Sequence, residues 1–339
     1  MRRAVMHLFI DDEKILSKLS EKGNPLERLD AVMDWNIFLS LLSELFSRKD
    51  KVISRGGRPH LDYLMIFKVL LLQRLHNLSD DAMEYQLLDR ISFRRFVGCH
   101  EDTVPDAKTI WLYREKLTKS GREKELFDLF YAHLTDEGVI AHSGQIVDAT
   151  FVKCPKQRNS REDNQKIKKG EKIEGWNKTK RSQKDVDATW TRKGDVRYFG
   201  YKNHICVDRK SKLIKNYEVT TASVHDSNVL APLCDANEAV FDDSAYVGKS
   251  VPEGCRHHTI RRAFRNKPLT ETDKVINRHI SKVRCRVEHV FGFIKMSMKG
   301  SICRAIGKAR AKTNVTLTNL LYNICRFEQI KRLGLPSWA

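Results

Sequence analysis

Gln145–Val152, with the sequence QIVDATFV, is the most strand-like segment of the chain. It is apolar and rich in β-branched and aromatic side chains, and it lies between a His-Ser-Gly turn and Pro155, a pattern that predicts a central buried strand. Asp148 interrupts the run. A buried carboxylate needs a cation, a metal ion or an open strand end to offset its charge. Two further acids follow, Asp243 in EAVFDDSAYVG and Glu288 in VRCRVEHVFGFIK, and we expect the three carboxylates to meet around divalent metal.

The size and charge of the chain narrow the class of partner. With 339 residues, it is long enough for two domains or for one domain with a large addition. Its formal net charge of +19 and its pI near 9.6 indicate a polyanion, either nucleic acid or an anionic membrane surface. The amino terminus has no apolar stretch of signal-peptide length, and the most apolar later run contains Lys68 and Arg74. We therefore expect nucleic acid rather than a membrane.

The cysteines do not predict a metal site. The chain has eight, with no CxxC pair and no zinc-finger spacing, so reduced thiols of a cytosolic protein are the simplest interpretation. Cys255-Arg-His257-His258 has no second ligand pair at a useful spacing. We interpret it as structural.

Residues 1–140 predict an all-α module. Segments with apolar side chains at helical spacing follow one another with short connections, and one connection is a turn with Arg55 and Arg58. This order is compatible with a helix-turn-helix-like DNA-binding domain. In the helix that begins near Ala107, Lys108 and Arg114 are candidates for contacts with DNA, although a solvated face fits their spacing equally well.

The pattern changes to strands from Asp148 onward. Residues 153–215 hold 20 Lys and Arg against 8 Asp and Glu, an excess of 12 within the chain's +19. The part at about 153–195 is polar and poorly periodic, and it predicts a basic insertion, either a mobile arm that DNA orders or a loop without contacts. After it come a hairpin, a short helix, an acidic strand ending at Asp243, a further strand and two long helices. This order predicts an α/β core of the ribonuclease H type in residues 141–339.

Two strand ends and one helix that carry acids suit phosphoryl transfer. Two divalent ions activate an attacking oxygen and stabilise a leaving one, and they need hard oxygen ligands on rigid elements. On the predicted helix, Arg284, Glu288 and Lys295 share one face, where the cations could hold DNA phosphates beside the acid. An ordinary surface ion pair is the alternative for Arg284 and Glu288.

Three residues of the basic hairpin region are candidates for contacts with the same partner. Arg197 and Lys202 could grip a DNA strand. Trp190 could stack on a base, although packing inside the protein is the more common fate of a tryptophan.

Taken together, these segments resemble a known family. The chain is similar over nearly its whole length to bacterial insertion-sequence transposases of the DDE superfamily, in the insertion-sequence-five group, whose catalytic core has the ribonuclease H-like fold of the retroviral integrase superfamily. Its helical half, with RGGRPHLDYLMIFKVLLLQRLHNLSDDAMEYQLLDRISFRRFVG and VPDAKTIWLYREKL, resembles the InsH-like transposase domain. Its second half matches through VDATFV, DATWTRKGDVRYFGYKNH, DDSAY and RCRVEHVFGFIK.

The resemblance implies which acids are catalytic. Asp148, Asp243 and Glu288 become the first, second and third acids and the ligands of two Mg²⁺ ions, for which Mn²⁺ is a substitute. Asp242 is the rival for the second acid, and the Asp-x-x-Tyr spacing to Tyr246 favours Asp243.

The resemblance also covers a signature on the last acidic helix. The family pattern Tyr-(2)-Arg-(3)-Glu-(6)-Lys gives Arg284, Glu288 and Lys295. The chain departs from it at the tyrosine position, which Ser281 occupies. A stacking or phosphate contact of that ring is therefore missing.

The activity implied by the resemblance is DNA transposition. Water attacks a phosphodiester at the end of the element, and the freed 3′-hydroxyl then attacks target DNA. The implied partners are double-stranded DNA, as terminal inverted repeats and as target, and a second copy of the chain on that DNA, because two ends must be brought together. The implied location is the bacterial cytoplasm, at the nucleoid. Two alternatives stay open: a metal nuclease without strand transfer, and an inactive or domesticated transposase that acts as a DNA-binding regulator.

Overall fold

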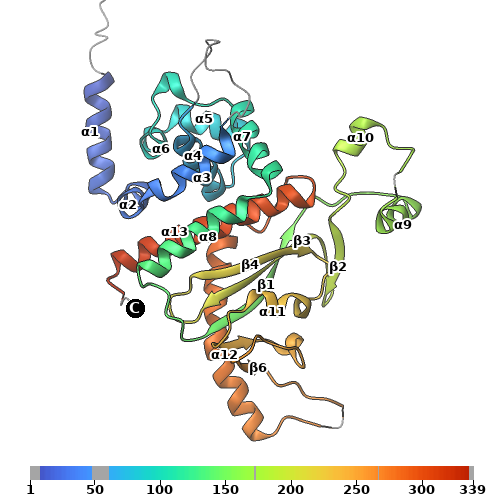
Figure 1. The fold of residues 1–339 in the computed structure, drawn as a ribbon. Helices are drawn as coiled ribbons and strands as arrows, with labels where there is room; N and C mark the ends of the chain where they lie inside the picture. Colours follow the sequence, from blue (N-terminus) through green and yellow to red (C-terminus); the bar gives the residue numbers. More distant parts are fainter. Residues whose placement is uncertain (1–7, 48–60, 172, 266, 336–339) are drawn as a thin grey trace, which may run out of the picture. The chain divides into compact units, whose positions relative to one another are not determined.

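The protein forms two compact units, one within residues 1–133 and 320–336 and the other mainly within 134–319 (Figure 1). A computed structural model describes residues 8–47, 61–171, 173–265 and 267–335. The sequence predicts a single division near residue 140, whereas the segment from Leu320 belongs to the helical unit. The predicted turn with Arg55 and Arg58 lies outside the described residues. Within the described ranges, no helix has the length and apolar content that a membrane span needs.

The first unit consists of short helices. Capping side chains in the sequence explain where several begin: Asn24, Asp62, Ser79 and Asp106 each accept a hydrogen bond from a backbone N–H in the following turn. The elements are α1 (Leu8–Glu21), α2 (Pro25–Val32), η2 (Trp35–Phe38), α3 (Leu39–Phe46), α4 (Tyr63–His76), α5 (Asp80–Asp89), α6 (Ile91–Val97), η3 (Glu101–Thr103), α7 (Ala107–Ser120) and α8 (Glu123–Asp136). The all-α prediction for this region is confirmed, and α1 is an addition to it.

Helix α4 forms the centre of the helical unit. All its residues from Met65 to Gln73 are buried, as its uniformly apolar sequence predicts. Lys68 is the charged exception: its Nζ lies 2.5 Å from Asp30 Oδ1 and 4.7 Å from the centre of the Trp35 ring. The ion pair and the aromatic face offset the cost of burying the ammonium group.

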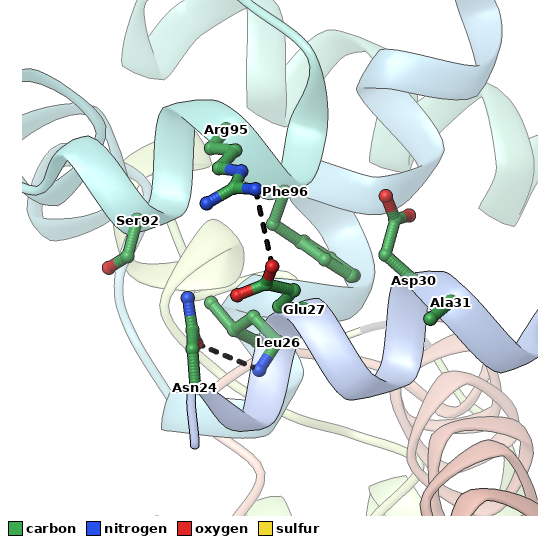
Figure 2. A pocket seen from close by; sticks show the side chains of 8 residues that line it. All are labelled: Asn24, Leu26, Glu27, Asp30, Ala31, Ser92, Arg95 and Phe96. Atoms are coloured by element: carbon green, nitrogen blue, oxygen red, sulfur yellow. Dashed lines mark hydrogen bonds and ion pairs between the residues drawn. The ribbon is translucent and has the colours of Figure 1, made fainter. Parts of the chain in front are cut away.

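A small cleft of about 190 Å³ lies between α2 and α6 (Figure 2). Arg95 Nη2 lies 3.2 Å from Glu27 Oε1 in this cleft, and Phe96 supplies an apolar wall. Asn24 caps α2 through Oδ1, and its Nδ2 is buried with no hydrogen-bond partner among the described residues. Two acids and one cation line the cleft, so it has neither the carboxylate cluster of a metal site nor the positive charge of a DNA site.

The second unit is built on a six-stranded sheet. β1 lies in its interior, antiparallel to β3 on one side and parallel to β5 on the other; β2 and β4 pair with β3, and β6 pairs with β5. The strands are β1 (Gln145–Lys153), β2 (Thr189–Lys193), β3 (Val196–Asp208), β4 (Ile214–Thr221), β5 (Ala239–Asp242) and β6 (Arg256–Thr259). The prediction of an α/β core around a central first strand is confirmed, and β2 is an addition to it.

The close approach of β1 and β3 depends on Gly200. Its φ is +144°, and a Cβ placed on it would lie 2.2 Å from Val152 O and 2.9 Å from Cys154 N. No side chain fits in that space. The two strands therefore pass each other here only with glycine.

One face of the sheet carries Asp148 and lies under the first half of α13 (Lys308–Arg332). In the strand registers, Asp148 is opposite Ile205, and Ile205 is opposite Tyr217, so the three side chains share this face. Tyr217 Oη lies 2.7 Å from Thr316 Oγ1 on α13. The hydrogen bond fixes the helix on the face that carries the acid.

A second long helix, α12 (Glu271–Gly292), packs against β1 and β5. It continues as one π-helical turn, Phe293–Ser297. The opposite face of the sheet packs against the short helix α11 (Leu230–Leu233). Helices therefore cover both faces, as expected for a strand as apolar as β1.

The basic insertion contains regular structure, so the prediction of an irregular arm is wrong. It forms two short helices, α9 (Arg161–Lys169) and α10 (Lys178–Ser182). Neither helix buries a residue, which is why the sequence lacks apolar periodicity here. Trp176 between them is buried, and its Nε1 donates to Asp163 Oδ2 at 3.2 Å.

Candidate active site

The register between β1 and β5 brings two of the predicted acids together. Ile146 pairs with Phe241, so Asp148 and Asp243, two residues further along the chain, are level with each other. The alternation of side chains puts both on the face that carries α12 and α13. Asp243 follows the last residue of β5, and its Oδ1 accepts a hydrogen bond from Ala245 N at 2.8 Å.

Asp242, the rival for the second acid, has another role. Its side chain is fully buried, and its Oδ2 lies 2.6 Å from His257 Nε2 on the neighbouring strand β6. Thr259 Oγ1 lies 2.8 Å from the same ring nitrogen. Strand alternation turns Asp242 to the face opposite Asp243, so the geometry favours Asp243 as the acid that substrate can reach.

Glu288 approaches the same region from α12. A capping box formed by Thr270 and Asp273 fixes the start of this helix. Val287 and Val290 are buried, whereas Glu288 lies on the exposed side. A helix packed against β1 and β5 thus carries the third acid.

Asp148 forms an ion pair with Arg284. Nη2 of the arginine lies 3.0 Å from Oδ2 of the aspartate, and each side chain is 17% exposed. The pKa of Asp148 is nevertheless raised to about 6. Burial is the main cause; the Arg284 charge and the Ala149 N–H oppose it, and the charges of Asp243 and Glu288 add to it. The two other acids therefore lie within electrostatic range of Asp148.

The three carboxylates suit a hard divalent cation in their chemistry. Carboxylate oxygens are ligands that Mg²⁺ and Mn²⁺ prefer, and the group carries more negative charge than Arg284 offsets. Within the described residues, however, no three His, Cys, Asp or Glu side chains are close enough to hold one ion together. Asp148 is turned to Arg284. Metal binding at this site therefore requires side-chain rotation.

The structure contradicts the prediction that Lys202 grips DNA. Its side chain is buried, and Nζ donates to Val224 O at 2.7 Å and to Asp226 Oδ1 at 2.8 Å. The short helix that begins at Asp226 packs against the turn that follows Asp243. Lys202 is thus a positioning residue that ties this loop to β3.

We expect Lys202→Met to destabilise the protein and to leave the salt dependence of DNA binding unchanged. Asp226 loses its cation, which costs about 1–3 kcal/mol; the cost stays moderate because its side chain is 30% exposed. Urea denaturation measures the first effect, and DNA binding at several salt concentrations measures the second. A smaller salt slope in this variant would mean that Lys202 contacts phosphate after all.

Arg114 is also engaged within the protein, so its contact with DNA stays a prediction that requires its ion pair to open. Its guanidinium forms a two-pronged ion pair with Asp80, with Nη2 2.7 Å from Oδ2, and Nη1 donates to Gln73 at 3.0 Å. Burial raises the pKa of Asp80, but the hydrogen bonds from Arg114 and Gln73 outweigh it and the net shift is downward. Lys108 is exposed on the first turn of α7, and its contact with DNA stays a prediction.

The remaining predicted cations lie in the sheet unit. Lys295 is exposed in the π-helical turn, with Nζ 5.3 Å from the centre of the Phe291 ring. Arg197 is exposed on β3 beside the hairpin turn. Arg284 reaches a phosphate only if its ion pair with Asp148 opens. The DNA contacts of all three stay predictions.

Two polar features near the acids were not predicted. Tyr246 is buried, its Oη has no hydrogen-bond partner among the described residues, and burial and the charges of the nearby aspartates raise its pKa. The second feature is the contact of His257 and Thr259 with Asp242. The alternation of these two residues along a predicted strand was the available signal, since it turns both toward one face.

An interior strand with an acid at its middle, a parallel neighbour followed directly by a second acid, and a helix that carries a third define a ribonuclease H-like core. A family model described as Transposase DDE domain matches residues 141–324, and one described as Transposase domain (DUF772) matches residues 14–116. The first match covers more than half of the chain, which therefore belongs to the transposase DDE domain family. The insertion-sequence-five group stays a prediction. The chain is also similar to a solved piggyBac transposase, in a cryo-EM structure of its synaptic complex with hairpin DNA (SNHP), with a TM-score of 0.44 and 10% identity over 93% of this chain and 77% of that one.

Proposed function

We propose that this transposase binds the terminal inverted repeats of its own insertion sequence, cuts the DNA there and joins the freed 3′-hydroxyl to target DNA. The observation that carries the proposal is the convergence of three acids. Strand register sets Asp148 and Asp243 level, and Glu288 lies within electrostatic range of Asp148. The net charge of +19 suits a DNA partner.

The three acids are proposed to hold two divalent ions, Mg²⁺ or Mn²⁺. When bound, such ions activate an attacking oxygen and stabilise a leaving one. The chain's part is an exchange of partners at Asp148. Opening its ion pair with Arg284 frees the carboxylate to act as a ligand and frees the guanidinium to hold a phosphate of the cut strand. Lys295, on the same side of the helix as Glu288, holds a second phosphate.

Two further features of the proposal concern the pairing of chains on DNA and the cellular location. An insertion sequence has two ends, so we propose that a pair of chains binds them together on DNA. The proposed setting is the cytoplasm of a bacterium, where the chromosome supplies the target. Sedimentation of the protein with and without end DNA tests the pairing.

The test of the proposed function is a cleavage and joining assay. Purified protein and Mg²⁺ are incubated with DNA that carries the inverted repeats flanking the gene, beside the Asp148→Asn variant. Joined products that require Asp148 support the proposal. Cuts without joining would make the protein a nuclease, and binding without any cut would make it a DNA-binding regulator.

We expect the cleavage rate to fall as the pH is lowered through about 6. The pKa of Asp148 is raised to about 6, and the protonated carboxyl can neither ligate a cation nor pair with one, so the rate falls about tenfold per pH unit below that point. Higher Mn²⁺ concentration should move the midpoint to lower pH, because the cation competes with the proton. A rate that is constant from pH 5 to 8 contradicts this role of Asp148.

A further inference from the structure

The hairpin of β2 and β3 carries a cation-lined cavity away from the three acids. The cavity is open, has a volume of about 730 Å³, and is lined by Lys156, Trp190, Thr191, Arg192 and Arg197. Trp190 is 45% exposed, although tryptophan is usually well buried. One side of its ring packs on Phe199, at 5.1 Å between ring centres. The rest of the ring is left open to a ligand.

The two arginines of this cavity face each other across the strands. Arg192 is directly opposite Arg197, and Trp190 is directly opposite Phe199, so all four side chains lie on one face of the hairpin. Arg192 is held by the turn: Nη2 lies 2.9 Å from Asp195 Oδ1. Among the described residues, the side chain of Arg197 has no hydrogen-bond or ion-pair partner. Like charges directly opposite destabilise a hairpin, and a bound anion would reverse that effect.

We propose that this face binds an unpaired nucleotide of the DNA, with the base stacked on Trp190 and a phosphate held by Arg197 and Lys156. An exposed aromatic ring can accept only a base that has left the helical stack, because the faces of paired bases are covered by their neighbours. The flanking cations supply the backbone contacts that every nucleotide offers. The inference rests on the proposed DNA-binding function and adds to it a subsite for single-stranded DNA.

The test compares one fluorescent oligonucleotide as a single strand and as a blunt duplex, by anisotropy at several salt concentrations. Trp190→Ala should weaken single-strand binding about tenfold or more and leave duplex binding within about twofold. Trp190→Phe should recover most of the loss, since it keeps a stacking ring. Arg197→Ala should lower the salt slope on the single strand by about 0.7.

Lys193 provides the matched control. It is an exposed cation of the same hairpin, but it lies on the opposite face from Arg192, so Lys193→Ala should keep the single-strand affinity within about twofold. Equal losses in Trp190→Ala for single strand and duplex would overturn the subsite, as would equal losses in Lys193→Ala and Arg197→Ala. If the wild-type protein bound neither form of DNA, the proposed function itself would fail.

A different observation points to a second contact with DNA, at Gly292 on α12. Its backbone is helical, with φ −59° and ψ −49°, and a Cβ placed on it would meet nothing within 4 Å. The fold therefore does not require glycine here, although glycine weakens a helix relative to alanine. Gly292 follows Glu288 by one turn, and Lys295 follows Gly292 by about another, so the three share one side of the helix.

We infer that a DNA strand passes against the backbone at Gly292 on its way to Glu288. The inference rests on the proposed function, and its test distinguishes a failure of the inference from a failure of the proposed function. Gly292→Ala and Gly292→Leu should raise the melting temperature by about 1–4 °C, while affinity for cleavable end DNA falls, more for leucine than for alanine. Gly292→Leu that binds and cuts as the wild type does would overturn the inference and leave the proposed function standing.

Discussion

We expect Asp148→Asn to abolish the proposed cleavage of the transposon ends and at the same time to make the protein more stable at neutral pH. The loss of a carboxylate ligand is expected to lower the cleavage rate by about three orders of magnitude or more. The gain in stability follows from the raised pKa of Asp148, which shows that the folded protein favours its neutral form. Asparagine resembles that form in shape and has no charge.

The pH dependence of this stability has a definite sign. The pKa of Asp148 is about 6 in the folded protein against the ordinary 3.8, so the group stabilises the fold below about pH 3.8, and this contribution is lost as the pH rises through about 6. At pH 7.5, Asp148→Asn should therefore exceed the wild type by about 1–3 kcal/mol in the free energy of unfolding. The difference should vanish toward pH 4. A variant less stable than the wild type at pH 7.5 would mean that the ion pair with Arg284 outweighs burial.

The adjacent acids at the end of β5, Asp242 and Asp243, give the second large difference between two variants. We expect Asp243→Asn to lower the cleavage rate by about three orders of magnitude or more, with a melting temperature near that of the wild type, because its carboxylate is the proposed ligand. Asp242→Asn should instead destabilise the fold by about 1–3 kcal/mol, because a buried hydrogen bond to His257 is weakened. Its cleavage rate, measured well below its melting temperature, should stay within about tenfold of the wild type.

Each variant of this pair is the control for the other, since both remove one charge from neighbouring residues. Cleavage rates at saturating DNA and melting curves of both proteins are the measurements. The assignment of the second acid is wrong if Asp242→Asn is inactive and folded while Asp243→Asn cuts normally.

Much of the core follows from the sequence because strand and helix periodicity report burial. The apolar run around Asp148 could only be an interior strand, and it is paired on both sides. A helix or strand that buries no side chains has no apolar periodicity, so the sequence pattern does not predict it. Helices α9 and α10 and the hairpin strand β2 expose most of their side chains, so the basic insertion was predicted as irregular although capping residues begin both helices.

For the candidate site, too, the sequence predicted some features and could not predict others. Spacing and resemblance selected Asp148, Asp243 and Glu288, which the fold brings to one region. They did not separate cations that face solvent from cations that neutralise acids: Lys202 and Arg114 pair with Asp226 and Asp80. Those partners are distant in the sequence or lie on other elements, and only the three-dimensional arrangement reveals them.

The central claim is that three acids far apart in the sequence hold divalent metal together. Mn²⁺ binding in the presence of duplex end DNA, followed by electron paramagnetic resonance, tests it most directly. We predict that the wild type binds Mn²⁺, that Asp148→Asn, Asp243→Asn and Glu288→Gln each lose most of this binding, and that Asp242→Asn keeps it. The claim would be contradicted if Asp148→Asn, Asp243→Asn and Glu288→Gln all bound Mn²⁺ with the wild-type affinity and stoichiometry.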